Sequence, residues 1–244
     1  MAKFAFDERA AARYDASDGD EFAPRVIDAT ASFLADLAGD GRALELAIGT
    51  GRVALPLSAR GVRVSGIDLS PFMVEQLRAK PGADAIDVVV GDMCTARVEG
   101  SFSLVYLVFN TICNLTAQDE QVDCFRNAAA HLEPGGCFVI EVGVPDLQRL
   151  PPGETVRAFC VEPAHLGFDE YHDLVAQTCS SHHYYVEDGV LEFFSGVFRY
   201  VWPSELDLMA QLAGMRRRDR WADWDRSPFT SDSRKHVSVW EKEE

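Results

Sequence analysis

Apolar residues gather along the chain in short runs, separated by segments of helical periodicity. The runs of strand length lie at 43–48, 62–68, 86–90, 102–109 and 137–142. The segments between them carry apolar residues at the three- and four-residue spacing of amphipathic helices. The run at 102–109 is almost wholly apolar, as expected where both faces of a parallel sheet are covered. Strands that alternate with helices in this way predict an α/β fold with a mostly parallel sheet.

The pattern changes after Gly143. Prolines at 145, 151 and 152 interrupt any helix in the segment that follows. Farther along, the alternating runs 184–187 and 190–193 flank Asp188-Gly189, a dipeptide typical of two-residue hairpins. We therefore expect residues from about 155 to 200 to form an antiparallel β insert.

The last part of the chain returns to the earlier pattern. Pro203 begins a segment of helical periodicity that runs to Leu212. Residues 215–224 and 236–240 then alternate as strands. This end of the chain is expected to complete the core.

A glycine turn, Gly49-Thr50-Gly51, joins the first apolar run to a helical segment. Gly49 and Gly51 allow positive φ and a close approach of the backbone to a ligand, while the helix directs its first free N–H groups toward the same point. These features predict a nucleotide-cofactor site. Because the spacing to Ala54 also fits the dinucleotide fingerprint, the glycines do not choose between cofactors.

Glu45 bears on the choice of cofactor, because it lies near the end of the strand and would face the ligand. A carboxylate there would repel a pyrophosphate and attract the sulfonium and amino groups of S-adenosylmethionine (SAM). The run from Glu45 to Gly51 resembles the first motif, acid-x-Gly-x-Gly-x-Gly, of the class I SAM-dependent methyltransferases, with Ala47 in place of the first glycine. The Leu-Glu-Pro-Gly-Gly segment at 132–136, between a helix and a strand, is also common in that family.

A second acid, Asp68, ends the second predicted strand, just before Ser70 and Pro71 begin a helix. An acid at this tip can accept hydrogen bonds from both ribose hydroxyls. Both candidate cofactors carry a ribose, so Asp68 supports a nucleoside without choosing between them.

The resemblance implies further contacts at the ends of the third and fourth strands. Asp92 would receive the adenine amino group, and Met93 would lie against the ring. Phe109, Asn110 and Thr111 would lie at the reactive end of the cofactor.

Two residues have alternative interpretations. Tyr14 either pins the N-terminal arm to the core or forms a lid over the methionine end of the cofactor. Met73 either packs in the core or touches adenine. The cofactor-binding residues expected from sequence are Tyr14, Glu45, Ala47, Gly49, Thr50, Gly51, Asp68, Leu69, Met73, Asp92, Met93, Phe109 and Asn110.

Composition narrows the class of partner. The net charge is −16, with 39 acidic residues against 23 Lys and Arg, which disfavours binding to the phosphate backbone of nucleic acid and favours a small-molecule acceptor. The six cysteines form no C-x-x-C pair, and the N-terminus does not read as a signal peptide. Since no apolar run approaches the roughly 20 residues that span a bilayer, we expect a cytoplasmic protein without a membrane anchor.

The resemblance also implies the whole architecture: a Rossmann-like α/β fold with a mostly parallel seven-stranded sheet, helices on both faces and an antiparallel last strand, plus a small antiparallel β insert. Residues 1–40 would form an arm and helix covering the cofactor, and 41–142 the SAM-binding core. The insert at 143–200 would be a substrate lid, and 201–244 would complete the sheet.

The reaction implied by the resemblance is direct displacement, in which an O or N atom of a small molecule takes the methyl group and S-adenosylhomocysteine (SAH) is the product. A general base, if one is needed, would come from the insert, where His182, His183 and Tyr184 are the candidates. No motif singles out any of the three. No spacing of His, Asp or Glu fits a recognised metal motif.

Two alternatives remain at this point. An NAD(P)-dependent oxidoreductase is disfavoured by Glu45, Asp92 and the segment at 132–136. A SAM-binding protein without catalysis is opposed only by the intact site. The identity of the acceptor, the methylated atom, the number of transfers and the oligomeric state stay open, with a homodimer as one option.

Overall fold

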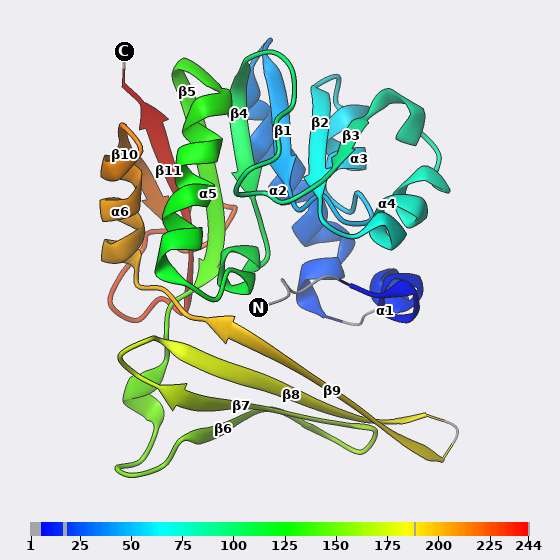
Figure 1. Ribbon diagram of the computed structural model, residues 1–244, viewed down its shortest axis with the longest axis vertical. Coiled ribbons are helices and arrows are strands. Elements are labelled where there is room, and N and C mark those ends of the chain that lie inside the picture. The colour runs from blue at the N-terminus through cyan, green and yellow to red at the C-terminus, as the bar shows by residue number, and fades with distance from the viewer. Residues whose placement is uncertain (1–5, 17–18, 188, 244) are drawn as a thin grey trace.

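Two sheets make up the fold, which the computed structural model describes for residues 6–16, 19–187 and 189–243 (Figure 1). The larger sheet has seven strands in the order β10-β11-β5-β4-β1-β2-β3. Its strands are β1 (Arg42–Leu46), β2 (Arg63–Asp68), β3 (Asp87–Val90), β4 (Phe102–Leu107), β5 (Leu132–Gly143), β10 (Met215–Trp221) and β11 (Lys235–Lys242). β11 lies antiparallel between β10 and β5, whereas the ladders among β1 to β5 are parallel. The fold class expected from sequence is therefore confirmed, including the antiparallel last strand inserted between its neighbours.

Helices cover both faces of this sheet. The helices are α1 (Glu8–Arg13), α2 (Pro24–Ala38), α3 (Ala54–Ala59), α4 (Pro71–Arg78), α5 (Gln118–His131) and α6 (Pro203–Leu212). Leu34 of α2 and Leu57 of α3 belong to the apolar cluster on one face. Phe125 of α5 and Leu206 of α6 belong to the cluster on the other. Strand β1 is buried from both sides, which explains its unbroken apolar run.

Several boundaries differ from the sequence expectation: for example, β10 ends at Trp221 and not at 224, and β11 runs beyond 236–240 at both ends. β4 ends at Leu107 and not at 109, because Phe109 and Asn110 adopt positive φ (56° and 57°) and turn the chain out of the strand. The segment at 132–136 is not a separate turn, since β5 already begins at Leu132. Phe102 pairs with Leu132 and Leu104 with Cys137, so the residues in between bulge out of the ladder.

The insert folds as a second, fully antiparallel sheet in the order β6-β7-β8-β9. Its strands are β6 (Val156–Glu162), β7 (His165–Asp173), β8 (Thr178–Glu187) and β9 (Val190–Arg199). Glu187 pairs with Val190, in the register of the predicted two-residue hairpin. Of that hairpin's central pair, Asp188 lies outside the described residues, and Gly189 has φ 77°. This sheet crosses beneath α1 and the N-terminal end of α5 (Figure 1).

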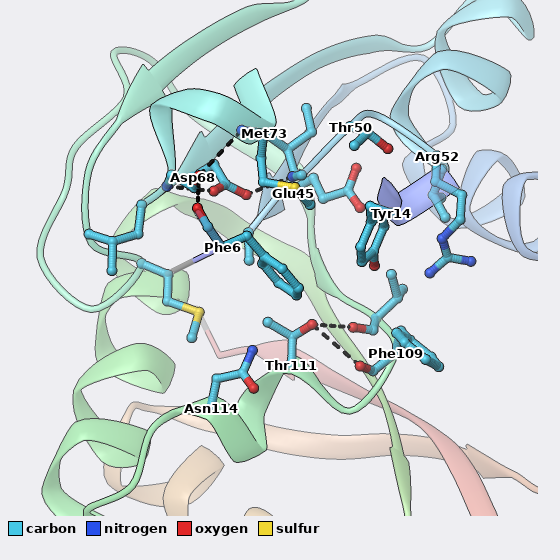
Figure 2. Close-up of a pocket in the computed structure, with 18 of the residues that line it drawn as sticks. Phe6, Tyr14, Glu45, Thr50, Arg52, Asp68, Met73, Phe109, Thr111 and Asn114 are labelled. Carbon is cyan, nitrogen blue, oxygen red and sulfur yellow. Dashed lines mark hydrogen bonds between the residues drawn. The ribbon is translucent and has the colours of Figure 1, made fainter. Parts of the chain in front are cut away.

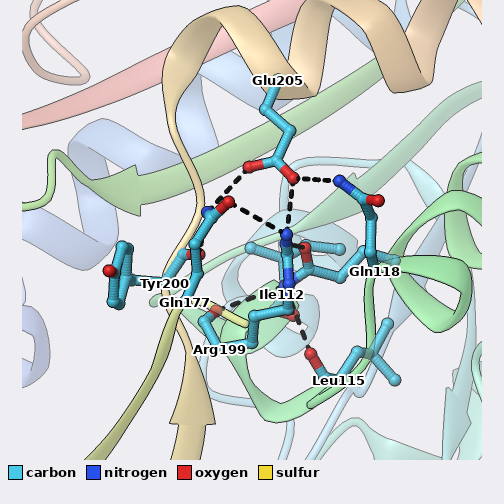
Figure 3. A network of polar contacts seen from close by, with 8 residues as sticks. Ile112, Leu115, Gln118, Gln177, Arg199, Tyr200 and Glu205 are labelled. Carbon is cyan, nitrogen blue, oxygen red and sulfur yellow. Dashed lines mark hydrogen bonds and ion pairs between the residues drawn. The ribbon is translucent and has the colours of Figure 1, made fainter. Parts of the chain in front are cut away.

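A buried ion pair joins the second sheet to the core (Figure 3). Arg199, at the end of β9, has a side chain only 4% exposed, and its Nη2 donates to Oε1 of Glu205 in α6 at 2.6 Å. Its Nη1 donates to Oε1 of Gln121 in α5. Nε2 of Gln121 in turn donates to the carbonyls of Ile112 and Leu115 at 3.1 and 3.2 Å. The short 3₁₀ turn η4 (Thr111–Asn114) and the second sheet are thus held by one network.

Candidate active site

The carboxyl ends of β1, β2, β3 and β4 open on a single pocket, where cofactors bind in open α/β sheets (Figure 2). Its empty volume, open solvent at the mouth included, is about 860 Å³. The lining residues are Phe6, Tyr14, Glu45, Ala47, Ile48, Gly49, Thr50, Arg52, Val53, Asp68, Leu69, Ser70, Met73, Asp92, Met93, Val108, Phe109, Thr111, Asn114 and Leu115. The pocket gathers most of the residues expected from sequence to bind the cofactor.

The glycine turn forms the pocket's inner end. Ala47, Gly49 and Gly51 all have positive φ, at 54°, 57° and 76°. A Cβ atom built on Gly49 would lie 3.2 Å from Met73, so a side chain there would crowd both the turn and its neighbour. Ala47 adopts the same region despite its Cβ, which shows that this position of the motif tolerates the smallest side chain.

Asp68 fixes the turn from the end of β2. Its Oδ2 accepts from the Gly49 amide at 2.7 Å, and its Oδ1 accepts from the Ser70 amide at 2.8 Å. Burial raises the pKa of the carboxyl, and the two N–H groups act against that rise. Two bonds leave each carboxylate oxygen with a free lone pair, so Asp68 still has acceptor capacity toward the pocket.

Glu45 is a buried acid at the end of β1, only 3% exposed. Tyr106 donates its hydroxyl to Oε2 of Glu45 at 2.9 Å from the neighbouring strand β4. Burial raises the pKa of Glu45 to about 8, although the Tyr106 hydrogen bond and the charge of Arg52 act in the opposite direction. A cation near this carboxyl would favour its ionised form, so the site suits a positively charged ligand.

The pKa of Glu45 predicts how the free protein responds to pH. The folded state keeps this proton up to about pH 8, whereas the unfolded chain releases it near the ordinary value of 4.5. The folded state therefore binds more protons across that window, and its stability falls as pH rises from about 5 to 8. Glu45→Gln should flatten this fall in melting curves recorded without ligand. An equally steep fall in the variant would show that Glu45 ionises normally.

The ends of β2 and β3 supply a second wall. Oδ1 of Asp92 accepts from the Cys94 amide at 2.9 Å and so begins the turn after β3. Met73 and Met93 are 2% and 9% exposed, while Leu69 is 37% exposed. All four line the pocket, so Met73 is a core side chain that also faces the site, and its contact with adenine stays a prediction.

The N-terminal arm lies against the pocket. The rings of Phe6, Tyr14, Phe22 and Phe109 form a chain of edge-to-face contacts, with centroids 5.4, 5.3 and 6.3 Å apart. Burial raises the pKa of Tyr14. The arm is thereby connected to the turn that follows β4. Tyr14 lies in the described part of the arm, whereas residues 1–5 and 17–18 lie outside the described residues.

Polar contacts hold the same arm to the cofactor-side loops. Thr50 donates its hydroxyl to Oδ1 of Asp15 at 2.6 Å, and Asp15 also pairs with Lys80 at 2.5 Å. Ser70 donates its hydroxyl to the Phe6 carbonyl at 2.6 Å. The hydroxyl of Thr50, expected from sequence to serve the cofactor, is here engaged by the arm.

Arg52 is a pocket residue that sequence reasoning missed. Its guanidinium lies 5.0 and 5.4 Å from the ring centroids of Phe22 and Phe109, and it donates to the Glu21 carbonyl. The signal was present, since Arg52 directly follows the last glycine of the turn. It gives one end of an otherwise acidic pocket a positive charge. Phe6, at the start of the arm, was missed in the same way.

Two residues expected to bind the cofactor do not line the pocket. A Cβ atom on Gly51 would lie 2.3 Å from Leu77, so this glycine permits the helix α4 to pack against the turn. Oδ1 of Asn110 accepts from the Gly143 amide at 2.7 Å and ties the end of β4 to the end of β5. Gly51 and Asn110 therefore support the elements that form the pocket without lining it.

The candidates for a general base lie on opposite faces of the second sheet. His183 contacts His165, Tyr185 and Phe194. His182 and Tyr184 contact Phe168 and Phe193 on the other face. Alternation along β8 therefore separates His183 from the other two, as expected for adjacent residues of a strand.

Neither a metal-binding cluster nor a membrane-spanning helix occurs among the described residues. No cluster of three or more His, Cys, Asp or Glu side chains is placed to hold a metal ion within 6–16, 19–187 and 189–243. None of the helices described here is long and apolar enough to cross a membrane.

Comparisons with known proteins bear on the family. A sequence model of the methyltransferase domain matches residues 43–136. The solved structure of the CcbJ methyltransferase from Streptomyces caelestis superposes with a TM-score of 0.86 and 39% identity, covering 98% of this chain and 100% of that one. The cypemycin N-terminal methyltransferase of a Streptomyces species is 27% identical over 94% of this chain and 99% of its own length.

A more distant structure shares the fold. It is SAM-bound CalS10, an amino pentose methyltransferase from Micromonospora echinaspora, with a TM-score of 0.67, 21% identity and 99% coverage of both chains. The match to CcbJ extends over both sheets and at 39% identity shows common family membership. The chain therefore belongs to the class I SAM-dependent methyltransferases.

Proposed function

We propose that this methyltransferase transfers the methyl group of SAM to an amine nitrogen of a small molecule or peptide. Two of its relatives are named for nitrogen-bearing acceptors, the N-terminus of cypemycin and an amino pentose. The net charge of −16 supports an acceptor without a phosphate backbone. An amine free of its proton carries the lone pair that displacement at the methyl carbon requires.

The observation that carries the proposal is the acidic pocket at the carboxyl ends of the strands. Glu45, Asp68 and Asp92 all line it. Bound SAM supplies an electrophilic methyl group on a positively charged sulfur. We assign Glu45 to the cationic methionine end, Asp68 to the ribose hydroxyls and Asp92 to the adenine amino group. We assign Arg52, a positive charge in the lining, to the methionine carboxylate.

The remaining lining residues suit the other parts of the cofactor. Met73 and Met93 offer apolar side chains to the adenine ring. Thr111 and Asn114, both on η4, lie together at one side of the pocket, and Tyr14 of the arm lies apart from them, next to Glu45 (Figure 2). We assign the space between η4 and Tyr14 to the reactive end. The arm would then exclude water from the reactive end. Residues 41–142 would form the binding core, and the insert would face the acceptor.

Matched acceptors test the assignment to nitrogen. The protein is incubated with methyl-labelled SAM and either a short peptide or its N-acetylated form, and either glucosamine or glucose. We expect label in the free peptide or in glucosamine, and none in the N-acetylated peptide or in glucose. Acetylation removes the nucleophilic lone pair of the peptide amine, and glucose has hydroxyl groups in place of the amine. Mass spectrometry of the products locates the methyl group. Transfer to glucose without transfer to either amine would contradict the proposal.

A further inference from the structure

One face of the second sheet, here called the inner face, is directed at the core. Glu192 of β9 accepts from Arg13 of α1 at 3.0 Å and pairs also with Arg9. Farther along the same face, Cys179 of β8 lies close enough to Cys113 of η4 to contribute to the rise in the pKa of the Cys113 thiol, which burial causes in the main. The inner face therefore spans from α1 to η4.

The two elements at the ends of that span are also two walls of the cofactor pocket. Tyr14 directly follows α1, and Asn114 ends η4, and both line the pocket. On β8, Tyr185 pairs with Glu192 beneath α1, and Cys179 lies beneath η4. Ser181 and His183 fall between them on the same face, because side chains alternate along a strand. The middle of the inner face thus lies opposite the pocket.

An acid occupies this middle position. Asp169 of β7 pairs directly with Ser181, which donates a hydrogen bond to its carboxylate. Burial raises the pKa of Asp169. Arg157 lies across from it on β6, but its guanidinium is bonded to Asp146. No ion pair to Asp169 occurs among the residues that the structure describes.

The charge of Arg157 acts on Asp169 from β6, and His183 lies beside the acid as a hydrogen-bonding group. Nδ1 of His183 shares a hydrogen bond with Nε2 of His165 at 3.0 Å. Burial lowers the pKa of His183 to about 4. The imidazole is therefore uncharged near pH 7 and presents no positive charge to compete with a cation at Asp169. It adds a polar partner beside the carboxylate.

Aromatic side chains surround these polar groups. Gly167 lies beneath the ring of Phe159, so close that an added Cβ would approach it to 2.3 Å. Gly196, the partner of Ser181 on β9, lies between Phe194 and Phe198 in the same way. The glycines leave the polar centre recessed among rings. Carboxylate and aromatic faces together are the combination that recognises a cationic amine.

We propose that Asp169, Ser181 and His183 on the inner face form the acceptor site and first bind the acceptor amine as its ammonium ion, with the apolar body of the acceptor against the surrounding rings. The ammonium then releases one proton to solvent, which frees the lone pair for methyl transfer. This inference rests on the proposed function and assigns the recognition of its acceptor. The carboxylate of Asp169 accepts a hydrogen bond from an N–H group of the acceptor. The rings of Phe159, Phe194 and Phe198 pack against a ring or another apolar group of the acceptor. Asp169 acts as a specificity-determining residue here.

The test uses phenethylammonium as a probe, titrated calorimetrically into the complex of the full protein with SAH. We expect saturable binding of phenethylammonium and at least tenfold weaker binding of phenethyl alcohol, because a charge-assisted hydrogen bond is lost. Asp169→Asn should remove that preference. The matched control is Glu170→Gln, the adjacent acid, whose side chain contacts His182 on the outer face. It should leave phenethylammonium binding unchanged.

The outcomes separate this inference from the proposed function. Equal binding of the ammonium and the alcohol, no binding of either, or an unchanged preference in Asp169→Asn would overturn the acceptor site. The comparison of the two probes needs only the wild-type protein, so it decides even if a variant fails to fold. Absence of SAH binding in the first titration would instead bring down the proposed function.

Discussion

Replacing Asp68 with alanine is expected to weaken SAH binding at least tenfold. Hydrogen bonds to a charged group are worth about 1.5–3 kcal/mol, and about 1.4 kcal/mol is one decade of affinity. The structure adds a second reason. The same carboxylate holds the amides of Gly49 and Ser70, so its loss also frees the glycine turn. Titration calorimetry with SAH measures the effect on the folded variant.

Two further variants show which role matters. Asp68→Asn keeps one carbonyl acceptor for the turn but loses the charge, so it should lie between wild type and Asp68→Ala. Asp87→Ala removes an exposed acid at the start of the adjacent strand β3 and should leave affinity unchanged. Wild-type affinity in a folded Asp68→Ala protein would show that the cofactor does not use the end of β2.

Replacing Arg199 with methionine is expected to destabilise the fold by about 3–5 kcal/mol, the cost of leaving one member of a buried pair without its partner. In a chain of this size that corresponds to a melting temperature lower by roughly 6–20 °C. Glu205 would remain only 15% exposed with its charge uncompensated. Urea unfolding and a melting scan at neutral pH measure the loss.

The double variant Arg199→Met/Glu205→Gln tests the physical reason. Removing both charges should recover part of the stability, because an uncompensated buried charge no longer remains. Arg216→Met, which breaks a surface pair with Glu241, is the control and should have no measurable effect. If Arg199→Met has the same melting temperature as the wild type, the network does not hold the second sheet to the core.

The sequence was sufficient for the order of elements and for the choice of cofactor. Strand and helix periods differ, so the α/β pattern could be recognised segment by segment. Glycine spacing left NAD and SAM both open, and Glu45 favoured SAM because of its charge and place before the turn. The family assignment confirms that choice. The individual cofactor contacts, such as Asp68 and Asp92, stay predictions for the experiments above.

The parts that sequence did not reveal depend on tertiary contacts. Nothing local predicts that Phe109 adopts positive φ and contacts Phe22 of the arm. Arg52 directly follows the glycine turn, but its contacts with the rings of Phe22 and Phe109 come from tertiary structure. Alternation along a strand puts His182 and His183 on opposite faces, but only the contacts of Glu192 with α1 show which of the two faces the core.

The measurement that tests the central claim most directly compares SAH with NAD and NADP in melting scans. The acidic pocket predicts that SAH at 100 times its dissociation constant stabilises the protein by about 2.7 kcal/mol, while the dinucleotides give no shift. Their pyrophosphate would lie beside Glu45 and Asp68 in the pocket. A clear shift with NAD or NADP, and none with SAH or SAM, would contradict the account.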